Sequence, residues 1–174
     1  PHWPNPSVDI EETLFILSNL VKTGKIRYFG LGNPSENDLK KSILNNYSLF
    51  SIQTEYNLLE RSIEKIIQPL CDDNNIIILA WSPLLSGRIF ENKNDSKILR
   101  NLSNKYNASI TKIILAWMLS KNKRYPICRS SNPLHIKDNS ESIKLKLSKE
   151  EINKIDEDYA NKTIFIKPSE IIIN

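Results

Sequence analysis

The chain repeats one pattern along its length: an amphipathic stretch of helical length, a short break, an apolar stretch of strand length and a polar loop. The apolar stretches cover residues 26–31, 49–55, 76–81 and 125–129. The stretch 76–81 is apolar on both faces, as a strand must be when helices cover the sheet. Strands that alternate with helices in this way predict an α/β fold with a parallel sheet.

Capping residues mark the starts of several helices. Asp9 with Glu12 and Ser148 with Glu151 have the spacing of a capping box, and Ser35 is a third candidate cap. Helices are expected over residues 9–24, 35–44, 63–70, 96–106, 111–122, 134–145 and 148–158.

The apolar positions of these helices predict which side chains lie inward. We expect Leu44 and Ile66 to belong to buried stripes, and Trp117 with Met118 to lie in the core. Because the last helix ends near residue 158, residues 1–159 are expected to form one domain and residues 160–174 a loosely structured tail.

Composition excludes several classes of function. Lysines and acidic residues are interleaved over 144–158, as on a solvated helix face, so the net charge of +4 does not indicate a nucleic-acid binder. The longest apolar run, 76–81, is too short to span a membrane. Cys71 and Cys128 match no metal or redox spacing, so we expect two buried thiols in a cytoplasmic protein.

Two architectures are compatible with four strands. A doubly wound sheet of the flavodoxin type fits the length of 174 residues, whereas a closed (β/α)₈ barrel typically needs about 250. Half of such a barrel fits the spacing of the elements, but it would expose two sheet edges. Strand pattern alone does not choose between them.

The segments that follow the strands carry the candidate site, because ligands of parallel α/β folds bind at the carboxyl ends of strands. Asn33 and Gln53 are suited to hydrogen-bond an amide, and Trp81 offers a flat surface for stacking. Ser82 and Ser86 belong to a loop that is suited to phosphate oxygens.

A second anion site is expected after the last strand. Arg129 and Ser130 stand at the start of a predicted helix, where guanidinium charge and free backbone N–H groups act together. At the other end of the chain, His2 lies in the sequence Pro1-His2-Trp3-Pro4, which is typical of a strand end because proline cannot donate to a sheet ladder.

Four segments in order and spacing, 24–30, 53–59, 82–87 and 129–139, resemble the aldo-keto reductase family, and the resemblance runs from His2 to about Tyr159. It implies a (β/α)₈ TIM barrel that binds NADP(H) in an extended conformation. The matching part starts at the end of the fourth barrel strand. The resemblance therefore implies an incomplete barrel with about four βα units, strands 5 to 8, plus a C-terminal helix.

The resemblance also implies roles for individual residues. His2 would be catalytic and orient the substrate carbonyl. The cofactor site would consist of Gly32, Asn33 and Gln53 at the nicotinamide amide, Trp81 stacked on the nicotinamide ring, Ser82, Pro83, Leu84, Ser86 and Gly87 at the pyrophosphate, Arg129, Ser130 and His135 near the 2′-phosphate, and Asp138 with Asn139 at the adenine.

The chain departs from the family pattern at four of these positions. Gly32 replaces a usual serine, Trp81 a tyrosine, His135 an arginine and Asp138 a glutamate. NADP(H) is therefore the favoured cofactor and NAD(H) the alternative. The family's general-acid tyrosine, with its lysine and aspartate, matches no residue of this chain, so we expect the isolated chain to have little or no activity.

The favoured function is an NADP(H)-dependent oxidoreductase that reduces aldehydes or ketones, with a small carbonyl compound as its partner. In that case the chain holds most of the cofactor site. The alternatives are a non-catalytic nucleotide-sensing module and an inactive truncated fragment. Self-association of two half-barrels, which would cover the sheet edges, is a further expectation.

Overall fold

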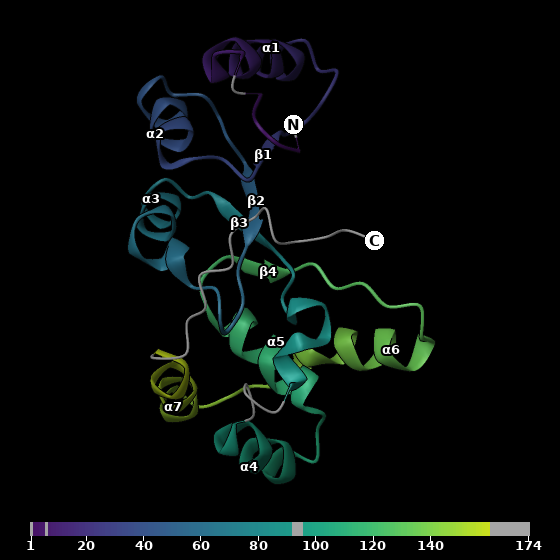
Figure 1. Cartoon of the computed structure of the whole chain (residues 1–174). Coiled ribbons are helices and arrows are strands. Elements are labelled where there is room, and N and C mark those ends of the chain that lie inside the picture. The colour runs from purple at the N-terminus through teal and green to yellow at the C-terminus, as the bar shows by residue number, and fades with distance from the viewer. Residues whose placement is uncertain (1, 6, 92–95, 161–174) are drawn as a thin grey trace. The chain divides into compact units, whose positions relative to one another are not determined.

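A four-stranded sheet organises the computed structural model, which describes residues 2–5, 7–91 and 96–160 (Figure 1). The strands are β1 (Gly30–Gly32), β2 (Ser51–Glu55), β3 (Ile77–Trp81) and β4 (Arg124–Pro126). The helices are α1 (Ile10–Lys22), α2 (Glu36–Leu44), α3 (Ile67–Asp73), α4 (Lys97–Tyr106), α5 (Ile110–Ser120), α6 (Pro133–Glu141) and α7 (Lys149–Ala160), with short 3₁₀ turns η1 (Ser62–Lys65), η2 (Leu85–Phe90) and η4 (Ser142–Lys144).

The chain divides into two compact units. The first contains the described residues of Pro1–Glu55, Ile63–Trp81 and Asn122–Tyr125, and the second those of Tyr56–Ser62, Ser82–Lys121 and Pro126–Asn174. The first unit therefore carries α1 to α3 and nearly all of the sheet, and the second carries α4 to α7.

The strand order decides between the two expected architectures. The order is β1-β2-β3-β4, and β1, β2 and β3 pair in parallel. A doubly wound sheet reverses its strand order at a switch point, and this sheet has no reversal. The predicted α/β class with a parallel sheet is confirmed, and the doubly wound alternative is wrong.

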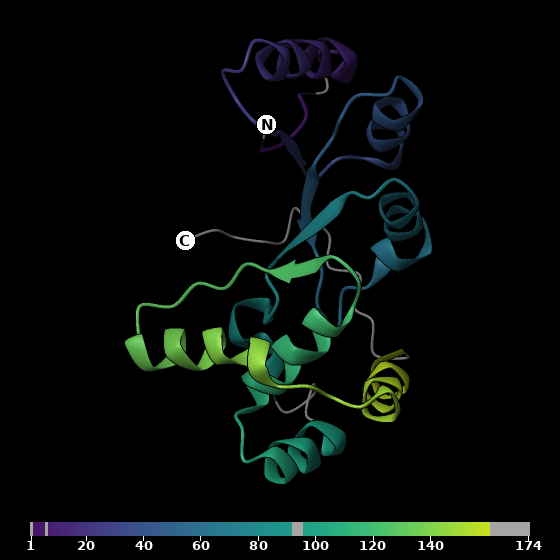
Figure 2. The ribbon, with the colours of Figure 1, turned by 180° about the vertical axis from the view of Figure 1, so that it is seen from behind.

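The two faces of the sheet differ in burial. Leu31, Ile52 and Ile78 are register partners and are almost completely buried, because this face packs against helices. Figures 1 and 2 show α2 and α3 on the same side of β1, β2 and β3. The opposite face carries half-buried side chains, among them Gln53 and Trp81.

Close approach of β1 to β2 requires a glycine. A Cβ atom at Gly30 would lie 2.5 Å from the Ser51 hydroxyl and 2.7 Å from the Ser51 carbonyl oxygen. Both distances are far inside van der Waals contact, so any other residue would push the two strands apart.

Helix α5 is the core of the second unit, with every residue from Ile113 to Met118 buried. The buried Trp117 ring stacks on Tyr56 at 5.8 Å between centroids, and its indole N–H donates to Asp156 on α7 at 3.0 Å. Figure 1 shows α4, α6 and α7 around α5. The predicted core positions of Trp117 and Met118 are confirmed.

The predicted caps are largely confirmed. Ser148 and Glu151 form a reciprocal capping box, and Ser35 forms one with Asp38. Asp9 caps α1 by accepting from the Glu11 N–H, but no box with Glu12 forms. Instead, the Asp9 carboxylate pairs with Lys41 on α2 at 3.0 Å.

Several predicted boundaries are wrong for local reasons. The first strand begins at Gly30 and not at residue 26, because the Lys25 and Ile26 N–H groups still donate to the Leu20 carbonyl at the end of α1. The last strand ends at Pro126 and not at residue 129, since proline cannot donate to the sheet ladder. The expected helix 134–145 is divided into α6 and η4.

Three burial predictions are also wrong. Leu44 is 81% exposed. It follows the buried Leu39 by five residues, so its side chain is rotated by about 140° around the helix axis from the buried face. Ile66 is exposed because it lies between η1 and α3 rather than inside one continuous helix. Cys71 is buried as expected, but Cys128 is exposed.

Two further expectations concern the tail and the membrane. The predicted tail lies outside the described residues except for Ala160, which ends α7. Among the helices that the structure describes, none has both the length and the apolar character needed to cross a bilayer.

Candidate functional site

The carboxyl ends of β1, β2 and β3 bring three of the predicted residues together. Asn33 directly follows β1, and its backbone N–H donates to the Gln53 carbonyl at 2.6 Å. The Asn33 side-chain oxygen accepts from the Trp81 indole N–H at 2.7 Å. This cluster arises because parallel strands end at the same edge of a sheet.

His2 joins this cluster through its backbone. The Asn33 side-chain nitrogen donates to the His2 carbonyl at 3.2 Å, while the His2 ring makes an edge contact with Trp3. Gly32 is the buried last residue of β1, and Gln53 lies on the same sheet face as Trp81. The structure thus places His2, Gly32, Asn33, Gln53 and Trp81 in one unit at one edge of the sheet.

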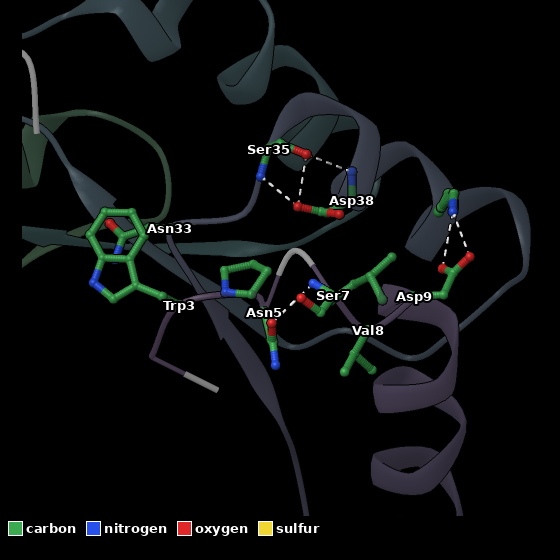
Figure 3. A pocket seen from close by; sticks show the side chains of 11 residues that line it. Trp3, Asn5, Ser7, Val8, Asp9, Asn33, Ser35 and Asp38 are labelled. Atoms are coloured by element: carbon green, nitrogen blue, oxygen red, sulfur yellow. Dashed lines mark hydrogen bonds and ion pairs between the residues drawn. The ribbon is translucent and has the colours of Figure 1, made fainter.

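A pocket of about 630 Å³ lies beside Asn33, between the loop that follows His2 and the starts of α1 and α2 (Figure 3). It is lined by Trp3, Pro4, Asn5, Ser7, Val8, Asp9, Ile10, Asn33, Ser35, Asp38 and Lys41. Apart from Asn33, none of these residues was predicted to belong to a site. The position of the loop in the sequence could have indicated this pocket, because the loop directly follows a predicted strand end.

The charged side chains of this pocket are held by hydrogen bonds and by one ion pair. Figure 3 shows the Ser35–Asp38 capping box and the ion pair that Asp9 makes. The hydrogen bond from the Glu11 N–H and the ion pair with Lys41 hold the pKa of Asp9 below its usual value. Both carboxylates among the described lining residues, Asp9 and Asp38, are thus engaged by neighbouring groups.

The predicted pyrophosphate loop has unusual backbone conformations. Ser82, Leu85, Ser86 and Gly87 have φ values of 53°, 51°, 53° and 90°. Non-glycine residues in this region cost of order 1–3 kcal/mol each and cluster at ligand-binding segments. Pro83 is buried and Leu84 half-buried, so the loop is anchored by apolar side chains while Ser86 and Gly87 face solvent.

Asn57 anchors the same loop, which the sequence analysis did not foresee. Its buried side chain donates to the Ser82 carbonyl at 3.2 Å and accepts from the N–H groups of Leu59 and Glu60. One amide thereby ties the segment after β2 to the segment after β3. The available signal was an asparagine after a strand, a residue type that hydrogen-bonds nearby backbone.

Arg129 and Ser130 stand immediately before α6, as predicted. Ser130 accepts from the Asn132 N–H at 3.1 Å, and Asn132 in turn caps α6, with Pro133 at the first helical position. The side chains of Arg129 and His135 are exposed. Within the described part of the chain, no hydrogen bond or ion pair holds the Arg129 guanidinium, which leaves its donors available to an anion.

Asp138 is engaged by α5. Its carboxylate pairs with Lys112 at 3.0 Å and accepts from the hydroxyl of Ser109, the residue that caps α5. Burial raises the pKa of Asp138, but the bonds from Ser109 and Lys112 outweigh this and keep the pKa below its usual value. Asn139 lies beside it on α6, where its carbonyl accepts from Ser142.

Three of the tyrosines, Tyr56, Tyr106 and Tyr159, are in environments unlike that of an activated general acid. Tyr56 and Tyr159 are completely buried, and the hydrogen bond with Glu151 raises the pKa of Tyr106. Over residues 2–5, 7–91 and 96–160, no cluster of three histidines, cysteines or carboxylates is arranged to bind a metal.

The structure therefore has two groups of predicted site residues. Residues from His2 to Trp81 lie in the first unit, and those from Ser82 to Asn139 in the second. Amide and aromatic groups dominate the first group. The second contains a strained loop and an exposed arginine beside a helix start.

Comparisons with known proteins bear on both groups. The family model described as "Aldo/keto reductase family" matches residues 1–160. Methylglyoxal reductase YeaE of Escherichia coli is 26% identical over 161 residues, which cover 91% of this chain and 56% of that protein. This chain is thus similar to a little more than half of that enzyme.

Solved structures give the same picture. The thermostable aldo-keto reductase Tm1743, solved with the inhibitor epalrestat, is 30% identical with a TM-score of 0.82, over 90% of this chain and 57% of that one. An aldo/keto reductase of Klebsiella pneumoniae, solved with NADP and acetate, has a TM-score of 0.81 at 24% identity, over 95% and 59% of the two chains. The chain spans slightly more than half the length of these proteins, and it belongs to the aldo/keto reductase family.

Proposed function

We propose that this chain is the cofactor-binding portion of an NADP(H)-dependent oxidoreductase that reduces an aldehyde or a ketone to an alcohol. The observation that carries the proposal is the amide of Asn33, held between Trp81 and His2 at the carboxyl edge of the sheet. Membership of the aldo/keto reductase family supports the reaction class. The Escherichia coli relative, a methylglyoxal reductase, supports a small carbonyl compound as substrate.

Each unit by itself offers groups that are chemically suited to one part of a dinucleotide with a 2′-phosphate. Asn33 offers an oriented amide to a carboxamide, and the loop around Ser86 and Gly87 is open to phosphate oxygens. Arg129 is exposed beside the start of α6, where guanidinium charge and helix N–H groups both attract a phosphate. This last feature favours NADP(H) over the alternative NAD(H).

In the proposed reaction, bound NADPH supplies the hydride. Asn33 and Gln53 orient the nicotinamide amide, and Trp81 supports the ring. His2 donates a hydrogen bond to the substrate carbonyl and so orients it toward the nicotinamide, an arrangement that lowers the entropic part of the barrier. We assign no residue of this chain as the proton donor.

The first experiment measures cofactor binding by the isolated chain. Titration with NADPH is expected to quench tryptophan fluorescence, and calorimetry is expected to give weaker binding for NADH. Arg129→Ala should reduce NADPH affinity about tenfold and leave NADH affinity unchanged, since an ion-assisted hydrogen bond contributes about 1.5–3 kcal/mol. Equal losses for both nucleotides would contradict the assignment of Arg129.

The second experiment separates catalysis from binding. NADPH oxidation with methylglyoxal is expected to be very slow in the isolated chain, because loss of a general acid costs roughly 10²–10⁴ in rate. Robust turnover would show that the chain contains a proton donor and would overturn this expectation. Failure to bind NADPH or NADH at millimolar concentration would overturn the proposed function itself.

A further inference from the structure

Trp81 makes a contact that a stacking role alone does not require. Its indole N–H reaches the side-chain oxygen of Asn33 at 2.7 Å. Trp81 ends β3 and Asn33 follows β1, so the contact crosses the intervening strand β2. Two strand spacings amount to about 10 Å, which only a long side chain with a donor at its end can bridge.

The contact determines which way the Asn33 amide points. An indole N–H is only a donor, so its partner must be the amide oxygen of Asn33. The His2 carbonyl is only an acceptor, so its partner must be the amide nitrogen. The two contacts are independent and specify the same orientation, which removes the ambiguity between oxygen and nitrogen that an isolated amide has.

The backbone of Asn33 is held as firmly as its side chain. Its N–H donates to the Gln53 carbonyl, and its φ of 48° lies in the left-handed region that asparagine tolerates. With both parts held, the amide retains one free hydrogen on its nitrogen and one free lone pair on its oxygen. A primary carboxamide offers the complementary acceptor and donor.

We propose that Trp81 is a positioning residue, which uses its indole N–H to hold the Asn33 amide in the orientation that receives a carboxamide. This inference rests on the proposed nicotinamide site and adds a second role to the aromatic surface of Trp81. The inference gives the indole N–H of Trp81 a function, because a phenyl ring at this position would supply a stacking surface but no hydrogen-bond donor.

The hydrogen bond is tested first without any ligand. The three tryptophans give three indole N–H signals in a nitrogen-labelled protein, and Trp81→Phe identifies the one from Trp81. Asn33→Gly removes the acceptor and tolerates the positive φ. It should shift the Trp81 signal upfield and speed its exchange with solvent, while the Trp117 signal, bonded to Asp156, stays unchanged. An unmoved Trp81 signal would overturn the inference.

The positioning role is tested with two ligands. NADPH contains the carboxamide, and adenosine 2′,5′-bisphosphate lacks it. Trp81→Phe should weaken NADPH binding about fivefold, the value of one hydrogen bond, in addition to any loss of stacking. Binding of adenosine 2′,5′-bisphosphate should stay at the wild-type value, since that ligand makes no contact with the Asn33 amide.

A double-mutant cycle separates positioning from stacking. If Trp81 acts through Asn33, Trp81→Phe should cost less NADPH affinity in the Asn33→Gly background than in the wild type. Equal costs in the two backgrounds would mean that Trp81 only stacks, and the inference would be wrong. If the wild type binds neither ligand, the proposed function is wrong, and the role of Trp81 is wrong with it. If the wild type binds NADPH but Trp81→Phe costs the same affinity in both backgrounds, only the role of Trp81 is wrong.

Discussion

The cluster around Asn33 and the segment around α6 are held in opposite ways. Asn33 is held by backbone and side-chain hydrogen bonds at the edge of a sheet whose other face is buried. Helix α6, which carries His135, Asp138 and Asn139, has no buried residue. It is attached to α5 by Lys112, which pairs with both Asp138 and Glu141.

This difference indicates how the two ends of a dinucleotide would be bound. The nicotinamide end would meet groups whose directions are already set, so little ordering remains to be done on binding. The adenosine end would meet exposed charge on a helix that depends on ion pairs, which salt and pH weaken. Variants in the two regions should therefore differ in effect, from large losses of stability to small changes in binding.

Removing apolar volume should affect the sheet far more than α6. Ile52 is completely buried on the helix-covered face, so Ile52→Ala should lower the free energy of unfolding by about 2–5 kcal/mol. Leu134 on α6 is 74% exposed, and Leu134→Ala should change stability by less than about 0.5 kcal/mol. Urea denaturation measures the free energy of unfolding of both variants. Similar decreases in the two would contradict the difference between the sheet and α6.

Glu151 shows what a buried carboxylate with several hydrogen-bond partners contributes in the same unit as α6. Its carboxylate is 9% exposed, and although burial raises its pKa, bonds from Lys105, Ser148 and Tyr106 outweigh this and lower the pKa to about 2. Because the folded-state pKa is lowered, the stabilisation is complete above pH 4.5 and is lost as the pH falls toward 2.

Glu151→Gln should therefore cost on the order of 2 kcal/mol of unfolding free energy at pH 7. The difference from the wild type should shrink as the pH falls from 4.5 to 2, which urea titrations at several pH values measure. Glu150→Gln is the matched control, because Glu150 is exposed and pairs with Lys154 on the helix surface. A pH-independent cost would contradict the role of the charge.

Lys112 is expected to have the smallest effect on stability but a selective effect on binding. Lys112→Met should weaken adenosine 2′,5′-bisphosphate binding about fivefold, because α6 loses its ion pairs to α5. Lys137→Met removes an exposed charge from α6, and among the described residues it breaks no ion pair, so it serves as the control. Calorimetry at two salt concentrations measures the change, and equal losses in both variants would show that only net charge matters.

Local signals allowed much of the fold to be predicted from the sequence. The alternation of apolar and amphipathic segments located all four strands, and the spacing of Ser148 and Glu151 located the start of α7. The ends of the elements were less accurate. The first strand starts late because Leu20 accepts two N–H groups beyond the end of α1, and no local pattern contains that contact.

The candidate site was predictable as a set of positions but not as a set of contacts. Asn33, Gln53 and Trp81 were recognised because they lie at or near the carboxyl ends of strands. That edge of the sheet brings Asn33 and Trp81 into contact. The assignment of Asp138 to the adenine stays a prediction, and the bonds of its carboxylate to Lys112 and Ser109 were not part of it. The anchoring role of Asn57 was missed, because it depends on the Ser82 carbonyl 25 residues further along the chain.

Periodicity and short motifs were sufficient to predict the α/β class, the order of the elements and the family, because none of these depends on contacts distant in the chain. Only the tertiary structure decided that Trp81 orients Asn33 and that Lys112 secures α6. Such contacts join residues 48 and 26 positions apart in the chain, and no local pattern specifies a hydrogen bond between them. Their physical basis is the packing of neighbouring strands and helices, which exists only in the folded chain.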